Sequence, residues 1–168
     1  MTTRTLVMNP KQVSQRLNRL AWQVYENCYL ENEIVIAGID ANGFRLAKRI
    51  AKYLEEISPI KVMLCEVQMN KENPLDGKTS VNIEKEKLEG KTIVVVDDVS
   101  NSGKTLMYGV KLFLEFPVKS VQTLVLVDRD HNLFPVKANF VGMSLATTMQ
   151  EHITVEMSEN GEEQVYLD

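Results

Sequence analysis

Cysteine and histidine are both scarce in this chain of 168 residues, which contains two of each. Cys28 and Cys65 lie in apolar stretches and lack the paired spacing of a zinc site, so we interpret them as small buried hydrophobic residues rather than a disulfide. His131 and His152 supply the only imidazoles, and the sequence offers no cluster of metal ligands. We therefore expect any metal to arrive together with a ligand.

Long apolar runs and an excess of basic residues are also lacking. No stretch approaches the roughly 20 apolar residues of a membrane-spanning helix, and residues 1–9 lack the apolar core of a signal peptide, which predicts a cytoplasmic protein. The 19 basic and 23 acidic residues give a formal net charge of −4, which argues against broad nucleic-acid binding. The length and the hydrophobic content of 44% are typical of one soluble domain over residues 1–168.

The most informative stretch is TIVVVDDVSNSGKTLMYG at residues 92–109. Its β-branched run at 93–96 predicts a central strand, two carboxylates at Asp97 and Asp98 follow directly, and residues 106–116 have a helical pattern. Small polar residues, one glycine and one cation fill the turn between them: Ser100, Asn101, Ser102, Gly103, Lys104 and Thr105. Because free N–H groups at a helix N-terminus bind anions, the stretch predicts carboxylates for sugar hydroxyls followed by donors for a phosphate.

Other interpretations of this stretch are weaker. The triplet Gly103-Lys104-Thr105 ends many nucleoside-triphosphate-binding loops, but that pattern requires a glycine where Asp98 stands. A dinucleotide-binding fold lacks its G-x-G-x-x-G after the first strand. The two aspartates could instead be solvated turn residues that cap the next helix. Two adjacent acids before a phosphate-type turn favour a ligand site.

Two further buried strands, predicted at residues 33–39 and 120–127, also end in polar residues. Asp40, Ala41, Asn42 and Gly43 follow the first strand and precede a helical pattern at 44–56, whereas Asp128, Arg129, Asp130 and His131 follow the second. Open α/β sheets bind ligands at the carboxyl ends of their strands, so we expect both segments to converge on the acidic pair. The alternatives are a plain tight turn at 40–43 and a surface-loop histidine at 131.

The remaining segments complete the predicted fold. Asn9 before Pro10 predicts the start of a helix whose apolar stripe reaches Cys28, and residues 59–68 have the pattern of another strand. Residues 69–89 are polar and without a period, which predicts a mobile excursion.

The last segment, residues 149–168, alternates in polarity and predicts a terminal hairpin that turns at 159–161 and finishes a sheet edge. The sequence as a whole predicts an α/β fold with a twisted, mostly parallel sheet flanked by helices.

Three segments together resemble the type I phosphoribosyltransferases. The run VVVDDVSNSGKT at residues 94–105 resembles their phosphoribosyl pyrophosphate (PRPP) motif nearly residue for residue, and GIDANGFRLAKRIA at 38–51 resembles their pyrophosphate loop. The segment at 126–145, LVDRDHNLFPVKANFVGMSL, resembles the base-pocket region of uracil-specific members that also regulate pyrimidine operons. The likeness covers most of the chain and is weakest at 69–89.

The resemblance implies transfer of ribose 5-phosphate from PRPP to a nucleobase, with Mg²⁺ and release of pyrophosphate. Asp97 and Asp98 would be the catalytic acids and would reach Mg²⁺ through ligand and water, residues 100–105 would hold the 5′-phosphate, and 40–43 would receive the pyrophosphate. The base pocket would include Asp128, Arg129 and His131. A lid at 69–89 would offer phosphate contacts, unless its lysines are merely solvated, from Lys71, Lys78, Thr79 and Ser80.

Two departures from the family pattern carry weight. Purine-specific members have an aspartate where this chain has Asn101, which favours a pyrimidine, uracil-like acceptor. Asp40 places a negative charge where an anion is expected, so a regulator that binds PRPP or a nucleotide with weak or no catalysis is the alternative. RNA binding is disfavoured by the negative net charge and by Trp22 and Asn27 beside Arg19, where related regulators are more basic. Self-association follows from the resemblance alone.

Overall fold

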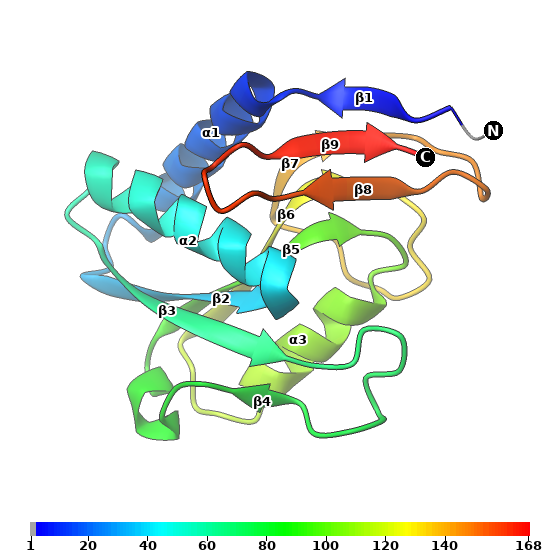
Figure 1. Cartoon of the computed structure of the whole chain (residues 1–168). Coiled ribbons are helices and arrows are strands. Elements are labelled where there is room, and N and C mark those ends of the chain that lie inside the picture. Colours follow the sequence, from blue (N-terminus) through cyan, green and yellow to red (C-terminus); the bar gives the residue numbers. More distant parts are fainter. Residues whose placement is uncertain (1–2) are drawn as a thin grey trace.

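A six-stranded, mostly parallel sheet forms the centre of the computed structural model, which describes residues 3–168 (Figure 1). The elements in chain order are β1 (Thr5–Met8), α1 (Pro10–Cys28), β2 (Glu33–Ile39), α2 (Asp40–Ile57), β3 (Lys61–Gln68), β4 (Ser80–Val81), the 3₁₀ helix η1 (Lys85–Leu88), β5 (Thr92–Ser100), α3 (Lys104–Leu114), β6 (Ser120–Asp128), β7 (Phe140–Ser144), β8 (Ile153–Glu156) and β9 (Gln164–Leu167). The strand order is β4-β3-β2-β5-β6-β7, and β4 alone runs antiparallel to its neighbour. This arrangement confirms the predicted α/β fold.

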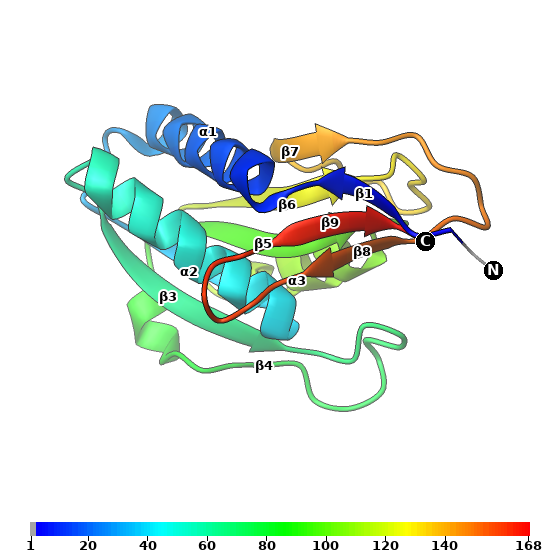
Figure 2. The same ribbon diagram turned by 45° about the horizontal axis from the view of Figure 1, so that its top comes forward.

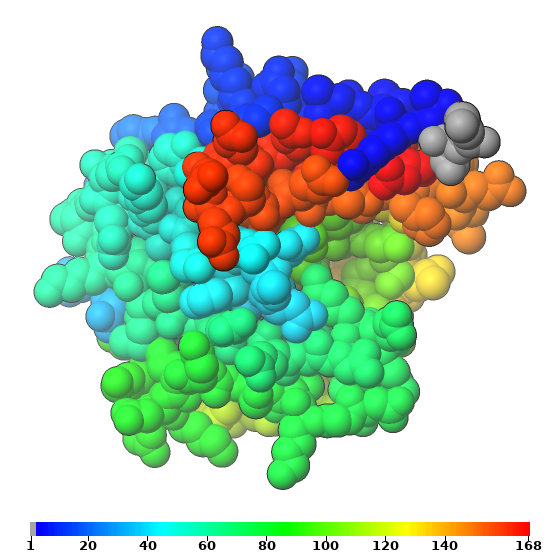
Figure 3. Space-filling view, viewed as in Figure 1, coloured from blue at the N-terminus to red at the C-terminus, as the bar shows by residue number. Residues whose placement is uncertain are grey.

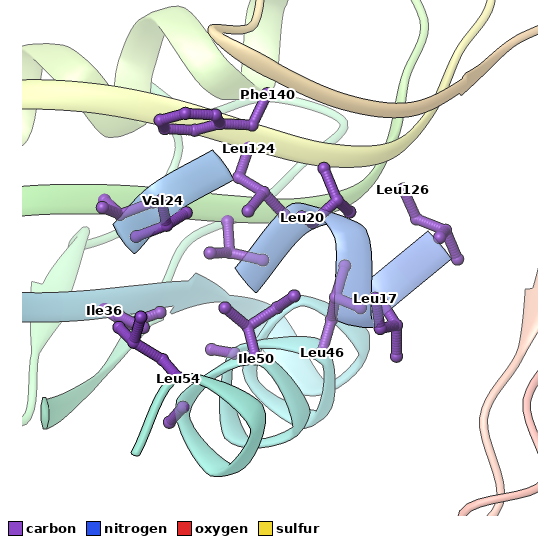
Figure 4. Close-up of a cluster of buried hydrophobic side chains, with 14 of the residues drawn as sticks. Leu17, Leu20, Val24, Ile36, Leu46, Ile50, Leu54, Leu124, Leu126 and Phe140 are labelled. Atoms are coloured by element: carbon purple, nitrogen blue, oxygen red, sulfur yellow. The ribbon is translucent and has the colours of Figure 1, made fainter. Parts of the chain in front are cut away.

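Helices cover both faces of the sheet, with α1 and α2 on one side and α3 on the other (Figures 1 and 2). Alternate residues of β2 face the two layers: Ile34 and Ile36 pack with α1 and α2, whereas Val35 and Ala37 pack with α3. Figure 4 shows the first of these clusters, in which side chains from both helices meet Ile36 and the β6 side chains. Burial on both faces explains why the central strands are continuous apolar runs.

The predicted helices and strands form, and several of their boundaries are extended or shifted. The helix at α1 begins with a capping box, because Asn9 Oδ1 accepts from the Gln12 backbone N–H and Gln12 Oε1 accepts from that of Asn9, both at 2.9 Å. Strand β5 continues to Ser100 because its pairing with β6 extends to that residue. Helix α2 begins at Asp40 instead of residue 44, and α3 spans Lys104–Leu114 instead of 106–116.

The terminal hairpin forms but does not lie at the edge of the main sheet. Strands β8 and β9 join β1 in a separate three-stranded sheet of order β1-β9-β8. Val155 and Val165 are almost fully buried in the same hydrophobic cluster as α1 and α2. The hairpin therefore covers this core cluster, which corrects the predicted position at a sheet edge.

The segment 69–89, here called the lid segment, contains β4 and η1, and Leu88 anchors its end in the core beneath α3. Cys28 and Cys65 are both free and buried, as predicted. Within residues 3–168, no helix has both the length and the apolarity needed to cross a membrane.

Candidate functional site

The two carboxylates of the PRPP motif lie in β5, immediately before the strand ends. Asp97 is 1% exposed, and its Oδ1 accepts from the Asp98 backbone N–H at 3.0 Å. Asp98 is half-buried, and it accepts from the Val99 N–H and from Asn42 Nδ2, each at 2.9 Å. Both side chains are therefore held in fixed positions at the carboxyl edge of the sheet.

A single cation from the lid segment faces both carboxylates. The Lys71 ammonium lies 2.7 Å from Asp97 Oδ1 and 3.5 Å from Asp98 Oδ1. Lys104 makes a reciprocal contact, because its ammonium donates to the Glu72 carbonyl at 3.2 Å. Two lysines therefore hold the lid segment against the PRPP motif: Lys71 belongs to the lid segment, and Lys104 belongs to the motif.

The shared cation affects the two acids differently. Burial raises the pKa of Asp97 to about 7, because the attraction of Lys71 does not outweigh desolvation and the repulsion of Asp98. Burial also acts to raise the pKa of Asp98, but Lys71 and the hydrogen bond from Asn42 leave that pKa below its usual value. Burial opposes the charge of Lys71, yet the two carboxylates raise its pKa. The cluster therefore holds one firm positive charge, one firm negative charge, and a second carboxylate that titrates near neutral pH.

The turn after β5 has the geometry expected of an anion site. Gly103 adopts a φ of 82°, which side chains disfavour, and this reverses the chain so that α3 begins at Lys104. A Cβ at this glycine would lie 2.9 Å from Val136 Cγ1. The turn and the start of α3 line a hollow of about 50 Å³ beside Asp97. The lining of this hollow includes Ser100, Ser102, Lys104 and Thr105 at the N-terminus of α3, which suits a phosphate.

Residues 40–43 form the first turn of α2 rather than a separate loop. Asp40 has a positive φ of 55°, and its carboxylate accepts from the Met69 backbone N–H at 3.4 Å, at the start of the lid segment. Asn42 links two elements, since its Nδ2 donates to Asp98 and, at 3.2 Å, to the Val155 carbonyl in β8. The β2 corner therefore connects the acidic pair to the lid segment and to the terminal hairpin.

A larger cavity of about 500 Å³ opens between this corner and the lid segment. Its charged lining residues are three acids and one cation: Asp40, Glu66, Asp76 and Lys78. A pyrophosphate in this cavity would meet repulsion unless cations accompanied it.

Of the four predicted lid contacts, Lys71 lies against the acidic pair and Lys78 lines the cavity at Asp40. Thr79 lines a different cavity against α3, together with Pro74 and Tyr108. Ser80 pairs with Gln68 in the sheet.

The side chains at the end of β6 form hydrogen bonds with other parts of the chain. Arg129 is 4% exposed and donates to Thr147 Oγ1 at 2.8 Å and to the carbonyls of Thr148 and Glu151 at 3.1 and 2.6 Å. His131 Nε2 lies 2.8 Å from the Thr147 carbonyl, a contact in which this nitrogen donates. Arg129 and His131 thus hold the loop at 147–151.

The last of the three base-pocket candidates, Asp128, is buried and accepts from the Asp130 N–H at 2.9 Å. The sequence did not identify the loop at 147–151, because its polar composition is like that of any other loop. Arg19, the cation retained in α1, donates to the carbonyls of Val141 and Gly142 at 3.2 and 2.6 Å.

No group of three or more metal-ligating side chains occurs within residues 3–168. The acidic pair offers two adjacent carboxylates that converge on one cation, the Lys71 ammonium. Because Mg²⁺ is commonly bound by one or two carboxylates together with ligand phosphates, the pair fits Mg²⁺ that enters with a phosphorylated ligand.

The chain resembles known proteins in sequence and in fold. A family model described as the phosphoribosyl transferase domain matches residues 7–160. The bifunctional protein PyrR of Clostridium novyi (strain NT) is 28% identical over 168 residues, covering 95% of this chain and 93% of that protein.

Solved structures share the fold at lower identity. A hypoxanthine-guanine phosphoribosyltransferase of Bacillus anthracis superposes with a TM-score of 0.70 at 20% identity, covering 85% of this chain and 83% of that one. A variant of the hypoxanthine phosphoribosyltransferase of Trypanosoma cruzi, complexed with the product IMP, reaches a TM-score of 0.77 at 14% identity, with 95% and 82% covered.

Proposed function

Because this chain belongs to the phosphoribosyl transferase domain family, we propose that it joins a nucleobase to ribose 5-phosphate, using PRPP as the donor and releasing pyrophosphate. The observation that carries this proposal is the pair Asp97 and Asp98 at the end of β5, followed directly by the Gly103 turn and the N-terminus of α3. Carboxylates for ribose hydroxyls and backbone donors for a phosphate are thereby adjacent, as PRPP requires.

In the proposed reaction, a ring nitrogen of the base attacks C1 of the ribose while the bond from C1 to the pyrophosphate oxygen breaks. The pyrophosphate leaves with the bonding electron pair, and the proton of the attacking ring nitrogen passes to solvent. Positive charge develops on the ribose, as in the oxocarbenium-like transition state of glycoside hydrolysis. Buried carboxylates beside the ribose stabilise that charge and orient the sugar hydroxyls.

Lys71 has a defined part in this scheme. Its ammonium lies on both carboxylates, in the region proposed for the ribose hydroxyls. Binding of PRPP would therefore displace it, and the released cation would lie near the departing pyrophosphate. When bound with PRPP, Mg²⁺ would supply further neutralisation of the pyrophosphate charge. The closed lid segment would keep water from the reacting carbon.

A pyrimidine acceptor resembling uracil is the finer part of the proposal. It rests on Asn101, which stands where the resemblance to purine-specific members calls for an aspartate, and on the likeness of 126–145 to uracil-specific members. Self-association and a cytoplasmic location also remain predictions from the sequence.

A second candidate function is a regulator that binds PRPP or a nucleotide with little turnover. The three carboxylates around the cavity at Asp40 favour its nucleotide-binding form, because they oppose a pyrophosphate there, and a nucleoside monophosphate has no pyrophosphate. PyrR of Clostridium novyi is named bifunctional, so the two functions can coexist in this family.

Product analysis distinguishes the two candidates. The protein is incubated with PRPP, Mg²⁺ and separately uracil, cytosine, orotate, hypoxanthine and guanine, and both pyrophosphate and the nucleoside monophosphate are quantified. We expect UMP and pyrophosphate in equal amounts with uracil. Measurable binding of PRPP without turnover of any base would exclude the enzyme and leave the regulator, and turnover confined to purines would exclude the pyrimidine acceptor.

A further inference from the structure

A separate cavity lies away from the PRPP motif, between α2 and the loop that joins β8 to β9. Figure 3 shows this loop, in orange to red, lying against α2 in cyan. The cavity, here called the α2 cavity, has a volume of about 640 Å³, within the roughly 300–1,000 Å³ typical of small-molecule sites. Four cations of α2 line it together with two carboxylates of the loop: Arg45, Lys48, Arg49 and Lys52 with Glu159 and Glu163.

Most of the cations that line the α2 cavity form no ion pair. Arg49 alone is paired, its Nε lying 3.1 Å from Oε1 of Glu163, which is 1% exposed. Over residues 3–168, Arg45, Lys48 and Lys52 form no ion pair with a carboxylate. A chain with a net charge of −4 thus concentrates cations in one hollow.

The loop binds both arginines, and the Lys48 ammonium lies over the Phe44 ring, 5.0 Å from its centroid. Arg45 donates to the Met157 carbonyl at 3.1 Å, a neutral partner that fixes the guanidinium without cancelling its charge. Buried Arg49 Nε and Glu163 Oε2 make no well-directed hydrogen bond within the described chain. Buried polar atoms without hydrogen bonds lower the stability of the folded protein. Such a cost is more typical of a binding site than of a contact that serves only the fold.

The spacing of the cations sets the size of the anion. Positions 45, 48, 49 and 52 lie on one face of α2, because residues three and four apart are neighbours on a helix. The helix rises roughly 10 Å from Arg45 to Lys52, so the four cations are spread over a length that several phosphate groups can occupy. The hollow is also small and partly closed by the loop, unlike the long grooves that bind nucleic-acid strands.

We propose that the α2 cavity binds a small anion that carries two or more phosphate groups, such as a nucleoside diphosphate or triphosphate. The site shares no lining residue with the acidic pair or with the hollow at Gly103. Binding there therefore does not depend on the proposed reaction with PRPP.

Calorimetric titration with inorganic tripolyphosphate tests this site, at fixed ionic strength because screening weakens exposed charges. The variant Lys48→Gln/Lys52→Gln changes two exposed side chains of the cavity, and Lys11→Gln/Lys61→Gln is a control with the same change of charge elsewhere on the surface. Each protein is titrated with and without saturating ribose 5-phosphate. This ligand carries a single phosphate, so it fills the site proposed at Asp97 and Asp98 without belonging to the class of anions proposed for the α2 cavity.

With ribose 5-phosphate present, we expect the cavity variant to bind tripolyphosphate about tenfold more weakly than the wild type, because charge-assisted hydrogen bonds from lysine to phosphate are strong. The control should change affinity by no more than about twofold. Equal affinities of the wild type and the cavity variant would overturn the proposal, as would equal losses in variant and control. Binding of an RNA oligonucleotide but not of tripolyphosphate would also overturn it. Failure of ribose 5-phosphate to bind would contradict the proposed function and leave the cavity result intact.

Discussion

Lys71 shows how a single residue can set the electrostatics of a site. Its one charge is shared between two carboxylates, of which Asp97 is the more deeply buried. Neither the contact nor the resulting difference between the acids follows from the sequence. The pattern identified Asp97 and Asp98 because they are adjacent and precede a phosphate-type turn, whereas Lys71 is 26 positions away in a polar segment. Only the folded chain brings the three groups together.

A pH dependence of stability follows from Asp97. The native carboxyl keeps its proton up to a pKa of about 7, whereas the unfolded chain releases it near the ordinary value of 3.8. The native state therefore binds more protons in this window, so the free energy of unfolding should fall as pH rises through it, by at most about 1.4 kcal/mol per pH unit. Urea unfolding between pH 4.5 and 7.5 measures this slope in the wild type and in Asp97→Asn.

The Asp97→Asn variant removes the titrating group and nearly preserves its shape. Its free energy of unfolding should fall less steeply with rising pH than that of the wild type, and the difference between the two slopes isolates this carboxyl. Parallel curves for the two proteins would show that Asp97 ionises in the native state as it does in the unfolded chain.

Among the elements, the corner between β2 and α2 determines where the acidic pair meets its neighbours. A Cβ at Gly38 would lie 2.3 Å from Phe44 Cα and 2.4 Å from the Gly43 carbonyl oxygen. The first turn of α2 therefore packs directly on the backbone of β2, and Asn42 in that turn reaches Asp98. The sequence predicted the strand and the helix, but it placed the helix start at residue 44. No pattern of polarity reveals that the backbone itself is the packing surface.

Gly38→Ala should destabilise the protein severely, because the clash is with backbone that cannot rotate away. We expect a loss of about 3 kcal/mol or more in the free energy of unfolding, at the upper end of overpacking effects. Gly109→Ala in α3 is the matched control. Its Cβ would meet only side-chain carbons of Ile39 and Val95, at 2.9 and 3.1 Å.

Denaturant unfolding of both alanine variants measures these two losses in the free energy of unfolding. The control should lose much less stability, because the contacting side chains can shift and alanine favours a helix by about 1 kcal/mol over glycine. Similar stability of Gly38→Ala and the wild type would mean that the corner is more open than its backbone contacts indicate.

For the whole molecule, the meeting of three strand ends at one edge of the sheet is what the sequence predicted best. Strands β2, β5 and β6 are parallel neighbours, so their carboxyl ends bring residues 40, 98 and 128 to one edge, as the apolar runs and polar strand ends indicated. The separate β1-β9-β8 sheet and the α2 cavity could not be predicted in this way. Both depend on the terminal hairpin packing against α1 and α2, a contact between segments more than 100 residues apart.

The central claim, a PRPP site built on Asp97 and Asp98, is tested most directly by calorimetric titration with PRPP and Mg²⁺. The variant Asp97→Asn/Asp98→Asn removes both charges, and Glu26→Gln/Glu56→Gln makes the same change of charge at two exposed helix positions. Circular dichroism establishes that each protein is folded. We predict that the control binds PRPP as the wild type does and that the aspartate variant binds at least about tenfold more weakly, a loss of about 1.4 kcal/mol or more. Binding of PRPP by a folded aspartate variant with the wild-type affinity would contradict the site.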